Sequence, residues 1–171
     1  DRRPGAGTTS MPKPSRADAA GAAPVNTDPV NVWHGSGENA ALSNLAPRAF
    51  TYESRRYQSV EHAYQSLKSG AFDQRTYDRY EGTTGRKIPG SLGTKTEAGW
   101  NIRLMEALVQ ASFEQNPDAR AALLATGNRP ISHTQDTGIW RASFPEILMR
   151  VRSRFATAVP GASVPLTATI P

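Results

Sequence analysis

The sequence contains no cysteine and only three histidines, at positions 34, 62 and 133. The absence of cysteine excludes disulfide bonds, thiolate metal ligands and a cysteine nucleophile. The three histidines are too widely spaced to resemble a metal-binding motif. We therefore expect neither a metal ion nor a cofactor.

Long apolar runs are also absent. No stretch of about 18 apolar residues occurs, so we expect no membrane-spanning segment. The first residues, Asp1 to Gly21, lack an apolar segment between a basic start and a small-residue cleavage site, so no secretory signal peptide is expected. A soluble protein, cytoplasmic or part of a virion, is the expectation.

Hydrophobic residues make up only 37% of the chain. Ordinary globular chains contain about 45 to 50%, which indicates that part of this chain builds no core. Residues 1–29 and 157–171 are rich in Pro, Ala, Gly, Ser and Thr and resemble linkers or arms. The 171 residues thus predict one compact domain, at 30–156, between two tails.

Tails of this composition lack the apolar side chains that offset the entropy lost on ordering. If they are ordered, a surface must hold them, and neighbouring chains of a larger assembly would provide it.

The net charge of +5 suits a polyanionic partner such as nucleic acid, but the basic residues form short clusters, which are typical of solvated faces.

Between the tails, the residue pattern predicts an α+β fold in which helices surround a small mixed sheet. The predicted strands are 30–33, a hairpin at 50–57 that turns at Glu53 and Ser54, and 130–133. A glycine-rich basic loop is expected at 82–99 and a further loop at 135–143.

Apolar spacing predicts four helices. The first begins at the N-cap Ser59 and ends before Gly70, and the second carries the stripe Met105, Val109 and Phe113. Pro117 begins a third helix that ends near Ala125, before a left-handed Gly127. Pro145 begins the last helix, on which Leu148, Val151 and Phe155 point inward and Arg150, Arg152 and Arg154 point outward.

The first helix carries a polar stripe opposite its apolar face. Glu61 and Lys68 are seven residues apart, a rotation of about 700 degrees, so they project from nearly one face with Gln65 between them. Such a stripe can line a cleft, but Glu and Lys at this spacing are also ordinary on a solvated helix face.

The residues around this helix carry a family resemblance. Leu42-Ser43-Asn44, followed by the run from Tyr57 to Gln65 (YQSVEHAYQ) and then Lys68, resembles the opening signature of the NADAR family. The resemblance continues through the segment at 113–117 (FEQNP) and that at 123–127 (LLATG), and it spans about 30–155. It implies a hydrolase of N-glycosidic bonds, which removes ADP-ribose from modified bases or splits related ribosyl compounds.

The resemblance also implies roles for individual residues. Lys68 would form a Schiff base with C1 of an opened ribose, because a neutral lysine amine attacks a carbonyl carbon. Glu61 would act as acid and base. Asn44 would donate amide hydrogen bonds to the sugar, although it can equally be a turn residue. Gln65 would contact the substrate.

The loop at 135–143 supplies two further candidates. Trp140 offers a flat surface for a base, unless it is a core anchor, and Asp136 can accept a hydrogen bond from a ribose hydroxyl. His133 next to them is expected to be a satisfied histidine at a sheet edge. The sequence departs from the family here, because Arg141, Ala142 and Ser143 stand where a Gly-rich segment usually follows the tryptophan.

Two functions remain compatible with the sequence. The first is the hydrolase, acting on an ADP-ribose-like or nucleoside-like ligand, for example ADP-ribosylated nucleic acid. The second is an inactive module of the same fold, kept for binding or attachment in a larger assembly such as a phage virion, where neighbouring chains contact the tails.

Overall fold

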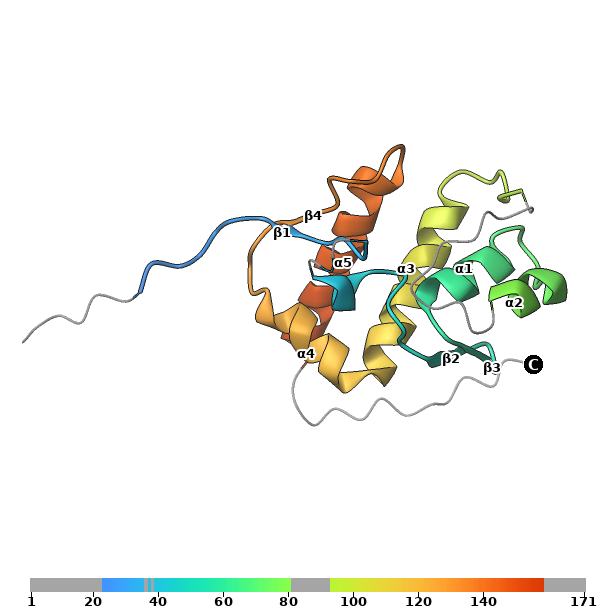
Figure 1. Cartoon of the computed structure of the whole chain (residues 1–171), viewed down its shortest axis with the longest axis horizontal. Helices are drawn as coiled ribbons and strands as arrows, with labels where there is room; N and C mark the ends of the chain where they lie inside the picture. The colour runs from blue at the N-terminus through green and yellow to red at the C-terminus, as the bar shows by residue number, and fades with distance from the viewer. Residues whose placement is uncertain (1–22, 36, 38, 81–92, 159–171) are drawn as a thin grey trace, which may run out of the picture.

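The computed structural model describes residues 23–35, 37, 39–80 and 93–158, and every helix and strand in them lies between Val30 and Thr157 (Figure 1). Most of both expected tails, 1–22 and 159–171, lies outside the described residues, as does 82–92 of the expected glycine-rich loop. Residues 23–29 are exposed and extend away from the domain (Figure 1).

The order of elements confirms an α+β fold. The elements are β1 (Val30–Asn31), a 3-10 helix η1 (Ala40–Leu42), β2 (Phe50–Tyr52), β3 (Arg55–Tyr57), α1 (Val60–Leu67), α2 (Gln74–Tyr80), α3 (Trp100–Gln115), α4 (Pro117–Ala125), β4 (Ile131–Ser132) and α5 (Trp140–Thr157). Both parallel and antiparallel pairing occur, but in two separate two-stranded pairs. β1 pairs with β4 in parallel, and β2 pairs with β3 antiparallel.

The β2–β3 hairpin turns where the sequence predicts. Glu53 and Ser54 have φ angles of 47° and 63°. Positive φ at both central residues gives the twist that matches two antiparallel strands joined by a tight turn. The turn sets Phe50 opposite Tyr57, and both rings are buried.

Helix α3 forms the centre of the domain. It packs against α1 on one side and α5 on the other, while α2 lies outside α1 and α4 crosses near the far ends of α3 and α5 (Figure 1). Met105, Val109 and Phe113 are buried, with Val109 and Phe113 fully enclosed. The predicted apolar stripe of this helix is confirmed, and the helix packs on α1.

The last helix begins earlier than predicted. α5 starts at Trp140 and contains Pro145 in its interior, so 140–143 belongs to a helix and not to a loop. Proline is most common at the start of a helix because it has no N–H to donate, and this preference led to the wrong boundary. Pro145 is itself buried within the helix.

Two further differences concern polar residues. Arg152 is buried and does not point outward, because its Nη1 donates to Thr126 Oγ1 and to the Arg129 carbonyl, both at 2.8 Å. It thereby ties α5 to the end of α4.

Helix α2 was not predicted, since its sequence QRTYDRY has no apolar stripe. None of the described helices is long and apolar enough to cross a lipid bilayer.

Replacing the N-cap Ser59 with alanine is expected to lower the free energy of unfolding by about 1 kcal/mol. Ser59 Oγ accepts a hydrogen bond of 3.1 Å from the His62 N–H, which has no partner within the helix. Urea denaturation measures the loss. The control Ser153→Ala changes an exposed serine in α5, and a loss as large there as at Ser59 would contradict the assignment.

Candidate functional site

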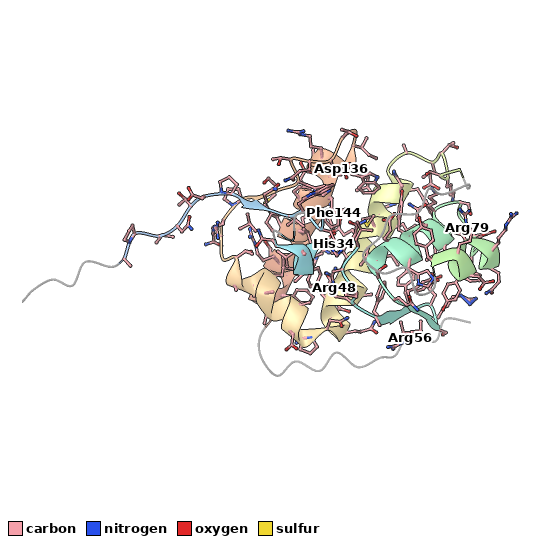
Figure 2. All side chains as sticks on the ribbon, viewed as in Figure 1. His34, Arg48, Arg56, Arg79, Asp136 and Phe144 are labelled. Carbon is pink, nitrogen blue, oxygen red and sulfur yellow. The ribbon has the colours of Figure 1, made fainter. Side chains whose placement is uncertain are left out.

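A cavity of about 260 Å³ opens between α1, α5 and the segments that follow β1 and β4. Its walls combine aromatic rings with a few polar side chains: Trp33, His34, Gly35, Ser43, Asn44, Leu45, Glu61, Tyr64, Gln65, Met105, His133, Gln135, Asp136, Trp140 and Phe144. Figure 2 labels three of them, Asp136, Phe144 and His34, which lie one below another in this view. Apolar walls with a few oriented polar groups are typical of small-molecule sites.

Five of the six residues proposed from the sequence line this one cavity. They are Asn44, Glu61, Gln65, Asp136 and Trp140. They come from positions up to 96 residues apart, brought together by the packing of α1 against the central helix and by the β1–β4 pairing. The polar stripe of α1 is therefore not a solvated face, because Glu61 and Gln65 are 4% and 6% exposed.

Glu61 is held by two amides. Asn44 Nδ2 donates to its Oε2 at 2.6 Å, and Gln65 Nε2 donates to its Oε1 at 2.9 Å. Hydrogen bonds that donate to both oxygens favour the carboxylate over the carboxylic acid, whereas burial acts in the opposite direction. Its place in the first turn of α1 acts in the same direction, because the helix dipole favours negative charge there.

The loop that carries Asn44 is joined to α1 by its backbone as well. The Asn44 carbonyl accepts from the Glu61 N–H at 2.9 Å, and this N–H has no partner within the helix. Buried Arg48 braces the loop by donating to the Ala41 carbonyl and, at 3.1 Å, to Ser112 Oγ of α3. Burial lowers the pKa of Arg48 to about 10.

Two buried polar atoms on the cavity wall have no hydrogen-bond partner in the described part of the chain. They are Gln65 Oε1, an acceptor, and His34 Nδ1. A buried polar atom without a partner costs about 1 to 3 kcal/mol, so a ligand or a water molecule that supplies the missing bond is favoured at these two places. A ligand that presents an N–H or O–H group to Gln65 fits this wall.

Trp140 and Tyr64, which both line the cavity, are in edge-to-face contact with ring centroids 5.4 Å apart. Trp140 is partly exposed, so it is a wall of the cavity more than a core anchor. Burial raises the pKa of Tyr64, while hydrogen bonds to Asn101 and Thr94 act in the opposite direction. Its phenol therefore stays neutral near neutral pH.

Asp136 and His133 form a pair on the wall opposite α1. His133 Nε2 lies 3.0 Å from Asp136 Oδ2, and the other carboxylate oxygen accepts from the Thr137 N–H at 2.7 Å. His133 Nδ1 lies 2.7 Å from the carbonyl of Val32, the residue that follows β1, and β1 is the strand that pairs with β4. His133 is thus a satisfied histidine at a sheet edge, as expected, and also a wall of the cavity.

Lys68 is the sixth proposed residue, and it is not among the described residues that line the cavity. It is the C-cap of α1 and half-buried, one turn beyond Tyr64 and Gln65, and its carbonyl accepts from the Lys95 N–H at 2.8 Å. Seven residues of helix place its backbone roughly 10 Å along the axis from Glu61.

Sequence reasoning missed Trp33, His34 and Tyr64 as parts of the site. Tyr64 lies in the same signature as Glu61 and Gln65, and its place next to Gln65 on a buried helix was a usable signal. Trp33 and His34 follow β1, and only the pairing of β1 with β4 brings them to His133. Among the described residues, no cluster of His, Asp and Glu suited to a metal ion is present.

The fold and the cavity together define a small α+β domain with a buried carboxylate in a ligand-sized site. This fold is similar to that of the E. coli protein YbiA, known from its NMR structure, with a TM-score of 0.58 at 20% sequence identity. The similarity covers 77% of this chain and 88% of YbiA. No family model matches the sequence, and no curated protein matches it significantly.

Proposed function

We propose that the chain belongs to the NADAR type and hydrolyses an N-glycosidic bond in an ADP-ribose-like substrate. The observation that carries this proposal is the buried Glu61 carboxylate, which two amides hold at the wall of an aromatic cavity. The YbiA-like fold and the signature around α1 support it.

The chemistry of such a bond explains the groups required. Breaking it builds positive charge at the anomeric carbon and negative charge on the departing base. A fixed carboxylate inside a cavity stabilises the former charge, because electrostatic interactions are stronger where water is excluded. Glu61 therefore acts through its carboxylate, as the partner of the cationic carbon and as the base that takes a proton from the nucleophile.

The size of the cavity indicates which part of the substrate enters. Ligand pockets usually measure about 300 to 1,000 Å³, so a cavity of about 260 Å³ accepts the ribosyl group and its base while the diphosphate lies outside. Trp140 and Tyr64 provide faces for the base. Lys68, at the end of α1, completes the proposed mechanism as the residue that bonds to C1 of the opened ribose.

Glu61→Gln is expected to lower kcat on ADP-ribosylated guanine DNA by about 10² to 10³. The substitution keeps the shape of the side chain and removes its charge. Gln65 can rotate its amide to present the unpaired Oε1 to the new amide, so the helix is expected to fold. Release of ADP-ribose, measured by chromatography, gives the rate.

A matched control exists in α3. Gln110 Nε2 donates to Glu114 Oε1 at 2.7 Å, the same pair of residue types four residues apart on a helix, but exposed and remote from the cavity. Glu114→Gln is expected to keep the wild-type rate. A wild-type chain that binds ADP-ribose without cleaving the substrate would refute the enzyme and favour the binding module.

A further inference from the structure

We propose that His133 and Asp136 together form the proton donor of this site, which delivers a proton to the departing base. This inference rests on the proposed function and adds the acid that Glu61 does not supply. Asp136 is then a catalytic residue and not only a group that binds a ribose hydroxyl. His133 positions it and shares its proton.

The argument begins with the two nitrogens of His133. A backbone carbonyl only accepts hydrogen bonds, so Nδ1, 2.7 Å from the Val32 carbonyl, must carry a hydrogen. Nε2 faces the carboxyl oxygen of Asp136 at 3.0 Å. A neutral ring with its hydrogen on Nδ1 and an ionised Asp136 would place two lone pairs against each other.

The contact therefore holds one additional proton, either on Nε2 of an imidazolium or on a neutral Asp136 carboxyl. In both cases the pair as a whole is neutral, which makes its burial against the rings of Trp33 and Phe144 less costly. The Asp136 side chain is 31% exposed and borders the cavity, so this proton lies within reach of a ligand.

His62 shows the opposite arrangement in the same chain. Its Nδ1 accepts from the Gln58 N–H at 3.1 Å, and its Nε2 lies 3.0 Å from the Tyr77 carbonyl. One nitrogen accepts and the other donates, so a neutral ring satisfies both contacts. These two contacts of His62 thus need only a neutral ring, whereas the two contacts of His133 need one more proton.

With this donor, each proton that the proposed reaction transfers has a source and an acceptor. The C1–N bond breaks with its electron pair going to nitrogen, and that nitrogen takes the proton from the His133–Asp136 pair, which is left with one negative charge. The carbon gains its new bond from the Lys68 amine, which loses a proton to the Glu61 carboxylate. The ring then opens by breaking its C1–O4′ bond, which leaves an iminium between C1 and Lys68, and the ring oxygen takes the proton from Glu61 to become a hydroxyl. Water hydrolyses the iminium to the C1 carbonyl and the free Lys68 amine, and the proton released in this step restores the neutral His133–Asp136 pair.

The pair has few ionisable neighbours in the described part of the chain. Glu61, Tyr64 and His34 share the cavity with it. Arg141, in the first turn of α5, donates to the Thr134 carbonyl at 2.8 Å and lies 3.5 Å from the Asp136 carbonyl. Glu146, one turn further along α5, lines a second hollow together with His133. A pH profile must separate the titration of these five groups from that of the pair.

The protonation of the pair is measured by ¹⁵N NMR of the histidine rings in the full chain. At neutral pH we expect both nitrogens of His133 to be protonated or to share a proton with Asp136. In Asp136→Asn the new amide donates to Nε2, so His133 should change to a neutral ring with its hydrogen on Nδ1. A neutral His133 in the wild-type chain, with an unprotonated Nε2 and an ionised Asp136, overturns the proposal.

The catalytic role is tested with ADP-ribosylated guanine DNA. Asp136→Asn is expected to lower kcat by about 10² to 10⁴, to leave KM nearly unchanged, and to remove the fall in rate at high pH that loss of the shared proton causes in the wild type. Asp118→Asn, the same change at an exposed position of α4, should behave as the wild type. A raised KM with the alkaline fall retained would mean that Asp136 only binds the sugar, and would overturn the acid role while the hydrolase stands. A wild-type chain without turnover would instead refute the proposed function itself.

Discussion

Replacing Lys68 with arginine is expected to abolish turnover while leaving ligand affinity largely intact. Arginine keeps the positive charge, but its guanidinium stays protonated and cannot form a Schiff base. Loss of a covalent nucleophile costs roughly 10⁴-fold or more in kcat. The contacts that hold this position are made by its backbone, to the Tyr64 carbonyl and from the Lys95 N–H, so the substitution leaves them in place.

Borohydride trapping separates the covalent mechanism from a purely electrostatic one. During turnover the reagent should reduce the Schiff base and attach substrate to Lys68 in the wild type, and Lys68→Arg should remain unlabelled. Lys95→Arg is the matched control, because Lys95 is exposed, pairs with Glu97 at 3.2 Å and lies next to the same helix end. Substantial activity in Lys68→Arg, without an adduct in the wild type, would refute the covalent step. The proposed hydrolysis would then depend on the Glu61 carboxylate without a Schiff base.

The largest effect on stability is expected from Phe113→Ala, with a loss of about 3 to 5 kcal/mol in the free energy of unfolding. Phe113 is fully enclosed on α3, where the helix meets the rest of the core, and the Arg48 guanidinium lies over its ring at 4.4 Å. Alanine would leave a cavity in the core, and the buried Arg48 guanidinium would lose the ring that it packs against. Domains of this size are stable by only about 5 to 15 kcal/mol, so this loss would remove a large fraction of the free energy of unfolding.

Urea denaturation of Phe113→Ala beside Phe155→Ala measures this effect. Phe155 is only partly buried near the end of α5, where Arg120 lies over its ring at 5.6 Å, so its loss should be clearly smaller. Equal losses at the two positions would mean that α3 does not form the centre of the core.

Much of the fold could be predicted because its signals are local. The N-cap at Ser59, the tight turn at Glu53 and Ser54, and the apolar stripe of α3 each depend on a few neighbouring residues and their backbone preferences. The start of α5 was misplaced for the same reason. A local preference of proline for helix starts was applied to a position where tertiary packing decides.

In the candidate site, too, the features set by neighbouring residues could be predicted and those set by distant segments could not. Glu61, Gln65 and Lys68 share a helix face by spacing alone, and their signature led to the expectation of a cleft there. Whether that face meets solvent or a cavity depends on what packs over it. The answer comes from the Asn44 loop and from Trp140 in the first turn of α5, distant segments that no helical period connects to α1.

The sequence by itself determined the α+β class, the helix α1 with its polar stripe, and the chemical types of the candidate residues, because these follow from spacing and side-chain chemistry. Only the tertiary structure decided which groups meet. It holds both oxygens of Glu61 with amides, and through the β1–β4 pairing it places His133 between the Val32 carbonyl and Asp136. Hydrogen-bond partners of a buried group determine its charge, and they come from segments far apart in the chain, so the form in which each candidate acts depends on the packing of the whole domain.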